Sequence, residues 1–115
     1  MLAVIFEVYP SAEGKDEYLR RAGELRTFLE GRDGLISIER FQSLADEGKI
    51  LSLSFWRDED AVAAWRNTLE HRAAQKQGRN ALFTSYRIRV AHVVRDYTAT
   101  ARDQAPLDSN RAWDL

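Results

Sequence analysis

The sequence predicts an α+β domain whose elements follow the order β-α-β-β-α-β. The first observation is a set of short segments rich in β-branched and aromatic residues, which are the predicted strands: residues 2–9, 35–45, 50–56 and 86–96. The second observation is a pair of longer segments with apolar residues at helical spacing, residues 15–30 and 58–77. The third is that glycines end both helical segments, at Gly31 and Gly78.

The first strand, residues 2–9, is predicted to lie in the middle of the sheet. Its alternating residues make two faces that are both mostly apolar, as expected of a strand covered on two sides. One face carries Leu2, Val4, Phe6 and Val8. Glu7 interrupts the other face, and we interpret it as a partly exposed carboxylate near the strand end, with an acid in a functional site as the alternative.

The two helices differ in what they carry. The first has an apolar stripe of Tyr18, Ala22, Leu25 and Leu29 and is predicted to be a scaffold helix without a chemical role. The second begins at Asp58, a predicted N-cap, and buries a stripe of Val62, Trp65, Leu69 and Ala73. His71 falls well off that stripe, so it belongs either to the exposed surface or to the rim of a pocket. Residues 80–84 are predicted to form a further short helical turn.

The last strand alternates between an apolar face and a basic face. His92 lies on the apolar face, where a satisfied core or interface histidine is the first interpretation and a catalytic base the second. Arg87, Arg89 and Arg95 share the other face, and we expect acidic residues on neighbouring strands, such as Glu39, to pair with them.

This order of elements predicts a ferredoxin-like fold with an antiparallel four-stranded sheet. Right-handed crossovers put both helices on one face of the sheet and leave the other face, which is partly apolar, uncovered. We therefore expect a homodimer that packs sheet face against sheet face. The domain is expected to span residues 1–97, while residues 98–115 lack periodicity and read as a loose tail that could dock on its own or the partner subunit through Trp113.

Composition excludes several classes of function. The formal net charge is -1, with 17 basic and 18 acidic residues, so neither nucleic acid nor an anionic membrane is an expected partner. The chain has no cysteine, which excludes disulfides, thiolate nucleophiles and cysteine-ligated metals. No apolar stretch has membrane-spanning length and the first residues read as a strand, so a cytoplasmic protein is expected.

One long motif carries a family resemblance. The segment FWRDEDAVAAWRNTLEHRAAQKQGR, followed by a strand ending in VVRDY, resembles the antibiotic biosynthesis monooxygenase (ABM) family, whose members are dimeric α+β barrel proteins. The likeness extends over about residues 1–97 and is greatest to the branch described as haem-degrading-monooxygenase-like. The motif is more specific for the fold than for the activity, because the superfamily also contains isomerases and binding proteins.

The resemblance implies a monooxygenase that needs neither metal nor flavin. Its substrate would be a small aromatic molecule of the phenol, quinol or anthrone type, held in a pocket between the second helix and the sheet. A base near the phenol favours the phenolate, and the candidate catalytic residues are His71, Glu7 and His92. The candidate substrate-binding residues are Trp65, Trp56, Arg40, Arg79, Tyr86 and Arg89. Among these, the arginines could stabilise a developing oxyanion, whereas the tryptophans are also typical core residues.

Haem binding or degradation is the second interpretation. Haem-degrading relatives have an asparagine on the first strand, a tryptophan on the second helix and an iron-ligating histidine near the end of that helix. Glu7 takes the place of the asparagine, Trp65 matches the tryptophan, and Gln75 stands where the histidine is expected. His71 lies six residues after Trp65, a step that turns it about 120° around the helix. No cofactor is therefore expected, with haem as an alternative ligand or substrate, and a non-catalytic ligand-binding dimer is the third interpretation.

Overall fold

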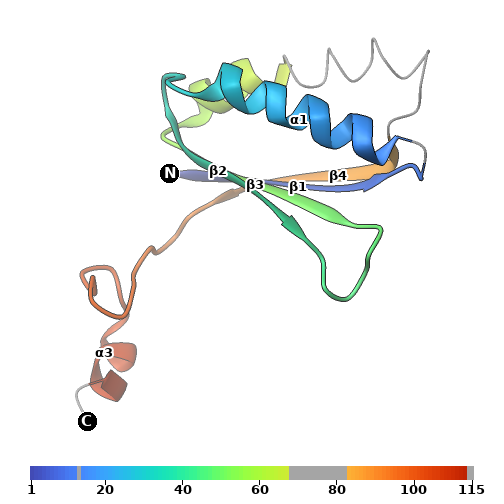
Figure 1. Cartoon of the computed structure of the whole chain (residues 1–115). Helices are drawn as coiled ribbons and strands as arrows, with labels where there is room; N and C mark the ends of the chain where they lie inside the picture. Colours follow the sequence, from blue (N-terminus) through green and yellow to red (C-terminus); the bar gives the residue numbers. More distant parts are fainter. Residues whose placement is uncertain (13, 68–82, 114–115) are drawn as a thin grey trace.

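A computed structural model describes residues 1–12, 14–67 and 83–113 of the chain. Strands β1 (Leu2–Pro10), β2 (Leu35–Gln42), β3 (Ile50–Trp56) and β4 (Phe83–His92) form an antiparallel sheet in the order β2-β3-β1-β4. Helix α1 (Lys15–Leu29) and a second helix, residues 59–67, cover the same face of this sheet (Figure 1). The predicted ferredoxin-like α+β fold is thus confirmed.

β1 is a central strand, as its two apolar faces predict. It pairs with β3 on one side and β4 on the other, and Leu2, Ala3, Val4 and Val8 are all buried. Because its neighbours satisfy its backbone groups on both edges, the strand can lie in the interior without unpaired peptides.

The last strand differs from its prediction. It begins at Phe83 instead of residue 86, and it ends at His92 instead of residue 96. The predicted helical turn is wrong at residues 83 and 84, which are strand, while residues 80–82 lie outside the described residues. The physical reason is pairing: β1 extends to Pro10, which lies opposite Phe83 across a register shift, so the start of β4 follows the length of β1. The predicted second helix is described over residues 59–67, and the remainder of that prediction lies outside the described residues.

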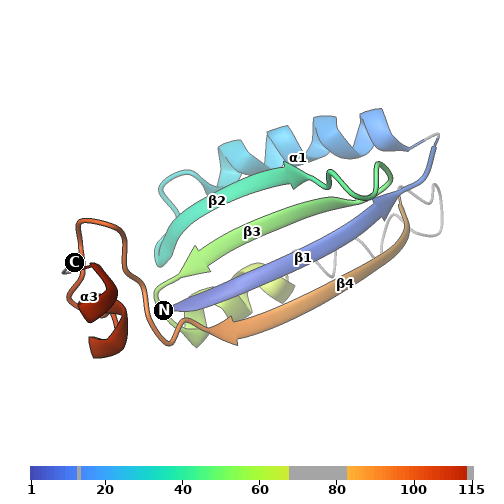
Figure 2. The same ribbon diagram turned by 90° about the horizontal axis from the view of Figure 1, so that it is seen from below.

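β3 points its polar residues toward the helices. Ser52 and Ser54 are 8% and 3% exposed, and Trp56 beside them is fully buried. Leu51, Leu53 and Phe55 alternate with them on the opposite face, which we call the open face, and are only partly buried. No helix in the described part of the chain covers the open face, which is the face seen from below in Figure 2. The apolar, uncovered sheet face expected from the sequence is therefore present.

The core between sheet and helices consists of two clusters. The larger one, which we call the tryptophan cluster, contains Leu2, Val4, Leu29, Trp56, Val62 and Trp65. The smaller one, the tyrosine cluster, contains Val8, Tyr18 and Ile50, with Phe6 packed against it.

A tight joint connects the loop after α1 to the start of the second helix. Gly34 has φ +83° and accepts a hydrogen bond from the backbone N–H of Arg57 at 2.7 Å. The Arg57 guanidinium also forms two hydrogen bonds with the Asp33 carboxylate, at 2.9 and 3.1 Å. Asp58 accepts a hydrogen bond from the backbone N–H of Ala61 at 3.0 Å, which confirms the predicted N-cap.

The segment after β4 leaves the sheet and projects past its end (Figures 1 and 2). It was predicted to be loose, but it contains the short helix α3 (Leu107–Trp113). Arg102 organises this segment by donating hydrogen bonds to Ser109 at 2.7 Å and to Asn110 at 3.1 Å, and its guanidinium lies 5.1 Å from the ring centre of Tyr97. Docking of this segment on a partner subunit stays a prediction.

None of the helices in the described part of the chain has the length and apolar character needed to span a bilayer.

Candidate functional site

A row of four side chains crosses the helix-facing side of the sheet between the two core clusters. The strand registers pair Arg40 with Ser52, Ser52 with Phe6, and Phe6 with Ile88. We call Arg40, Ser52, Phe6 and Ile88 the central row. Residues directly opposite one another on antiparallel strands point to the same face, so the four side chains share the space beneath the helices.

The central row is polar in the half that Arg40 and Ser52 supply, while Phe6 and Ile88 pack against the neighbouring clusters. One residue row further along, the Ile50–Val8 pair belongs to the tyrosine cluster; in the other direction, Val4 belongs to the tryptophan cluster. Arg40 is charged and Ser52 is small, so neither side chain continues the apolar packing of the clusters beside it. An interior section that is polar and flanked by apolar clusters is the composition typical of a site for a small organic ligand.

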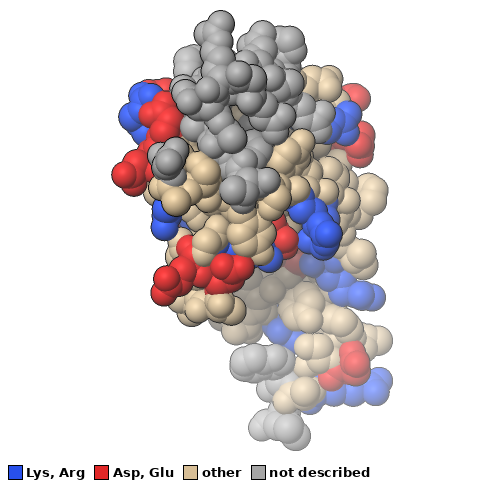
Figure 3. Space-filling view, turned by 90° about the vertical axis from the view of Figure 1, so that its right-hand side faces the viewer, with Lys and Arg blue, Asp and Glu red and all other residues tan. Residues whose placement is uncertain are grey.

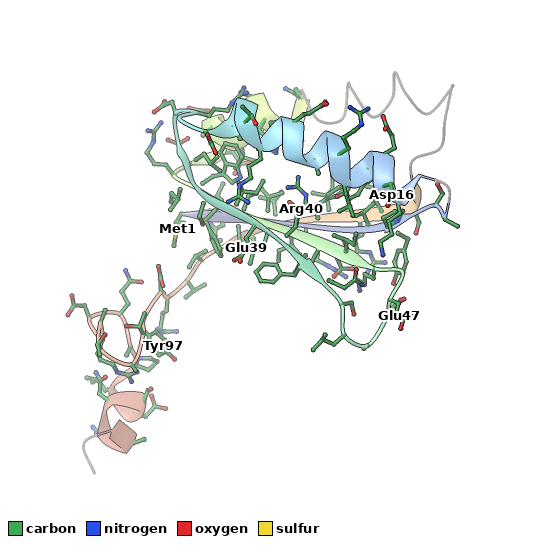
Figure 4. The ribbon with its side chains drawn as sticks, viewed as in Figure 1. Met1, Asp16, Glu39, Arg40, Glu47 and Tyr97 are labelled. Carbon is green, nitrogen blue, oxygen red and sulfur yellow. The ribbon has the colours of Figure 1, made fainter. Side chains whose placement is uncertain are left out.

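Arg40 is the residue of this row with an unmet hydrogen-bonding group. Its side chain points from β2 toward α1, whereas the neighbouring Glu39 points to the open face (Figure 4). The Arg40 Nε atom is buried and has no hydrogen-bond partner. Among the described residues, no carboxylate forms an ion pair with Arg40. Buried polar groups are almost always hydrogen-bonded in folded proteins, so an exception of this kind marks a candidate binding position.

Tyr18, on the first turns of α1, faces Arg40. Its side chain is 8% exposed, and burial raises the pKa of its hydroxyl, although the nearby Arg40 guanidinium partly opposes that shift. The hydroxyl therefore stays protonated and remains able to donate a hydrogen bond. The apolar spacing along this helix predicts only a scaffold role for Tyr18 and does not reveal this contact. The signal that could have found it is a lone hydroxyl within an otherwise aliphatic helical stripe.

The two predicted tryptophans lie together in the tryptophan cluster. The rings of Trp56 and Trp65 stack with their centres 6.3 Å apart and 23° between their planes. The indole N–H of Trp56 donates a hydrogen bond to the Ser54 hydroxyl at 2.9 Å, so this buried donor is satisfied. Both residues thus serve the core, and the Val4–Ser54 pair separates Trp56 from the central row.

Glu7 and Arg89 lie on the other side of the sheet. Arg89 donates a hydrogen bond to one Glu7 carboxylate oxygen at 3.2 Å, and Lys49 lies 3.2 Å from the other oxygen. The hydrogen bond from Lys49 is the largest cause that lowers the pKa of Glu7. Within one subunit, these residues therefore do not share a site with Trp65. The arginine row of β4 was expected to pair with acids such as Glu39, and the acid that Arg89 meets is Glu7.

The other predicted site residues are dispersed. Tyr86 is on the helix-facing side of β4, with its ring centre 5.8 Å from that of Phe6, so it lies next to the central row. His92 lies opposite Leu2 at the end of β4 and is exposed. His71 and Arg79 lie outside the described residues.

An open depression of about 300 Å³ lies elsewhere, at the joint between the loop after α1 and the second helix. Its lining residues are Arg32, Asp33, Arg57, Asp60, Ala61 and Ala64. Arg57 is already engaged there by Asp33 and Asp58, so its charge is compensated within the chain. This depression therefore differs in both place and chemistry from the predicted pocket between helix and sheet.

One of the three landmarks of a haem-degrading site is altered in the described residues. Trp65 matches the tryptophan, and positions 71 and 75 lie outside the described residues. Glu7, which takes the place of the first-strand asparagine, points away from the helices, as its ion pairs on the open face require. In the described part of the chain, no group of three His, Asp or Glu side chains is arranged to hold a metal ion.

Comparison with known sequences gives a family match and two relatives. The family model described as antibiotic biosynthesis monooxygenase matches residues 1–77. A protein of Pyricularia oryzae named jasmonate monooxygenase ABM is 46% identical over 93 residues, which are 81% of this chain and 43% of that protein. This chain thus spans less than half the length of that relative. The uncharacterized protein YqjZ of Bacillus subtilis is 32% identical over 93 residues, covering 81% of this chain and 79% of that protein.

Solved structures share the fold at low sequence identity. A putative antibiotic biosynthesis monooxygenase from Deinococcus radiodurans superposes with a TM-score of 0.72 at 13% identity, covering 85% of this chain and 97% of that one. The heme-degrader MhuD from Mycobacterium tuberculosis, solved with two hemes in its active site, gives a TM-score of 0.64 at 19% identity, covering 85% and 100%. At these identities, the likeness demonstrates a common fold.

Proposed function

Because the chain belongs to the antibiotic biosynthesis monooxygenase family, we propose that it is a monooxygenase acting on a small organic molecule bound at the central row. The observation that carries the proposal is the 46% identity with a jasmonate monooxygenase over 81% of this chain. The central row supports the proposal because it supplies a polar position between apolar clusters, inside the layer formed by sheet and helices.

The first candidate substrate is an electron-rich ring of the phenol, quinol or anthrone type. When such a ring loses its acidic proton, the anion can pass electrons to O₂ directly. In the anthrone case, a ring CH₂ and O₂ become C=O and water, so the substrate supplies all the electrons and one oxygen atom enters the product. Neither metal nor flavin is then required. Arg40 supports this chemistry because a nearby cation favours the deprotonated substrate and stabilises its oxyanion.

The second candidate substrate is jasmonate, because the Pyricularia oryzae relative carries that name. Hydroxylation at an alkyl C–H converts R–H and O₂ to R–OH and water only when two electrons and two protons are supplied. Such a reaction therefore requires an external reductant such as NADH, whereas oxidation of the ring substrate does not. Dependence on a reductant separates the two substrate classes.

We also propose that the working form is a homodimer joined through the open faces. The partly buried Leu51, Leu53 and Phe55 and the exposed Phe41 support this, since a monomer would leave these residues in water.

Oxygen uptake measures the proposed activity. We expect the protein to consume O₂ with anthrone, without added metal or reductant and in the presence of a chelator, and ¹⁸O₂ to place one labelled atom in the product. Jasmonate is assayed in parallel with and without NADH. Absence of uptake above the protein-free rate with both substrates would overturn the proposal.

Two histidine variants identify the base. His71→Ala and His92→Ala are each compared with the unchanged protein, and loss of a general base lowers kcat by about 10²- to 10⁴-fold. We expect one variant to lose activity and the other to serve as its control. A haem titration gives the competing result: a Soret band that disappears in His71→Ala would replace this proposal with haem binding.

A further inference from the structure

We propose that the substrate carries a carboxylate group, which binds to the guanidinium of Arg40 and the hydroxyl of Tyr18. This inference rests on the proposed function for the location of the site and adds the charge of the molecule that enters it. It assigns the ligand to the class of small carboxylic acids with an apolar body. Jasmonate belongs to this class, whereas anthrone has no carboxylate, so a ring substrate fits this inference only when it also carries a carboxylate.

The starting point is one unmatched group of Arg40. Its Nε–H is buried without a hydrogen-bond acceptor, although Arg40 lies between the sheet and α1 (Figure 4). The Arg40 side chain as a whole is partly exposed, and it shares a hydrogen bond with the Tyr18 hydroxyl. A buried polar group is normally hydrogen-bonded, and no described carboxylate forms an ion pair with Arg40, so we assign the unmatched N–H to an anion from outside the chain.

The nearby acidic residues that form ion pairs do so with cations other than Arg40. Glu17 and Glu24 pair with Arg20 on the exposed side of α1, and Glu7 pairs with cations on the open face. The buried polar residues of the described chain are the uncharged Ser52 and Ser54. Among the described residues, the interior thus contains the Arg40 Nε–H and the serine hydroxyls, but no carboxylate.

The groups around Arg40 suit a carboxylate more than a point anion. A guanidinium presents two parallel N–H donors that match the two oxygens of a carboxylate. Tyr18 supplies a further donor, because burial keeps its hydroxyl protonated, and Ser52 stands directly across from Arg40 on β3. Since Nε has no access to solvent, the carboxylate meets the Nη groups first, and a rotation of the Arg40 side chain then completes the bidentate pair.

The apolar body of the ligand follows from the neighbours of the row. Phe6 and Tyr86 lie on one side, with ring centres 5.8 Å apart, and the stacked Trp56 and Trp65 form the end of the tryptophan cluster. These rings accept flat or alicyclic apolar groups of modest size. The name of the Pyricularia oryzae relative fits this class, since jasmonate is the anion of a small alicyclic carboxylic acid.

The test compares acid and ester pairs that differ in charge. The probes are jasmonate against methyl jasmonate and 1-naphthylacetate against its methyl ester, with binding followed by calorimetry. We expect the unchanged protein to bind each acid at least about tenfold more tightly than its ester. A factor of about ten in affinity corresponds to one charge-assisted hydrogen bond, which the ester cannot form. In Arg40→Met the preference falls to about equal affinity, and in Tyr18→Phe it is reduced, with the ester affinities retained.

Arg26→Met is the matched control, because Arg26 is an exposed arginine in the last turn of α1 and the variant loses the same charge. It should keep the preference for the acid. Thermal unfolding without ligand then separates binding from a structural role. Arg40→Met should melt at the same temperature as Arg26→Met or higher, because a buried N–H without an acceptor has been replaced by part of an apolar chain of similar length.

The possible results separate this inference from the proposed function. Equal affinity of the unchanged protein for acids and esters, no binding of either pair, or a melting temperature of Arg40→Met well below that of Arg26→Met would overturn the carboxylate site. Oxygen uptake that persists in those cases would leave the monooxygenase standing. A preference for acids without any oxygen uptake would support the carboxylate site and overturn the monooxygenase.

Discussion

Glu7 lies between two cations on the open face, and this position determines how its charge contributes to stability. Lys49 and Arg89 each approach one of its carboxylate oxygens at 3.2 Å. The hydrogen bond from Lys49 is the largest of the effects that lower the pKa of Glu7 in the folded protein. A carboxylate whose pKa is lower in the folded state than in the unfolded state stabilises the fold where it is ionised in both states.

We predict a pH-dependent effect of Glu7→Gln on thermal stability. The unfolded glutamate titrates near its ordinary value of about 4.3, so the stabilisation should be complete above that pH and should decline as the pH falls through the lowered folded value. The measurement is the melting temperature of both proteins from about pH 7 to about pH 3, where the difference should shrink on acidification. Glu39→Gln is the control, since Glu39 lies on the same face without an ion pair among the described residues. A difference that stays constant over this range would contradict the prediction.

The residues of the candidate site were predictable to different degrees. Trp65 and Trp56 pack against each other between the second helix and the sheet, where the resemblance puts the substrate. Arg40 and Tyr86 lie on the same side of the sheet, but Arg40 faces α1. Tyr18 was missed, because a tyrosine in an apolar helical stripe looks the same in the sequence whether or not a cation faces it. The side of the sheet on which Glu7 lies could not be predicted. Strand alternation places Glu7 and Val8 on opposite faces, but only the structure shows which of the two faces the helices cover.

Among the elements, the joint between the loop after α1 and the second helix has little spare volume. A Cβ atom added to Gly34 would overlap the Cβ of Ala61, and the residue has φ +83°. Gly31, three residues earlier, has φ +77° with no atom close to the position of an added Cβ. Both glycines have a positive φ, but only at Gly34 would an added Cβ atom collide with the second helix.

We therefore predict that Gly34→Ala destabilises the protein more than Gly31→Ala does. Both variants should lose about 1–2 kcal/mol of unfolding free energy, because a residue with a Cβ disfavours positive φ. Gly34→Ala should lose about 1–3 kcal/mol more from overpacking. Urea unfolding measures both values.

Ala61→Gly removes the methyl group that an added Cβ at Gly34 would meet. When the two changes are combined, the free energy lost to overpacking should be recovered. A double-mutant cycle shows this after the cost of Ala61→Gly alone is subtracted. Equal destabilisation by the two glycine variants, or the absence of any recovery, would show that the joint tolerates a methyl group there.

The limits of sequence reasoning at this scale also have physical causes. The β3 segment Ile50–Trp56 and the helix over Lys15–Leu29 follow from alternation and helical spacing, which are local properties. The start of β4 at Phe83 depends on how far β1 extends beside it, and α3 depends on hydrogen bonds from Arg102, so both are set by distant residues. Local patterns cannot contain such information.

At the scale of the whole molecule, the open face is the surface through which the proposed dimer associates. Leu53 lies there between Ile5 and Glu39, its partners on the two neighbouring strands. On the face shown in Figure 3, acidic and basic side chains are intermixed. The proposed dimer therefore depends mainly on burial of apolar residues of the sheet.

We predict that Leu53→Lys converts a dimer into a monomer. A lysine at the centre of an apolar interface would bury an unpaired charge, so association should be lost while each subunit keeps its helical content. Light scattering after size-exclusion chromatography measures the mass, and circular dichroism measures the fold. Leu19→Lys is the control, because Leu19 is 41% exposed on α1. A monomeric unchanged protein at micromolar concentration, or a dimeric Leu53→Lys, would contradict the proposed interface.

The central row divides the interior into two apolar clusters, and this division has a consequence for the amount of protein that a cell maintains. The proposed substrate, bound there, would touch both clusters and join them into a continuous core. The folded state would then gain stability with the logarithm of the free substrate concentration. Chains without substrate would unfold more often and become accessible to proteases, so the abundance of the protein would rise and fall with the supply of the proposed substrate.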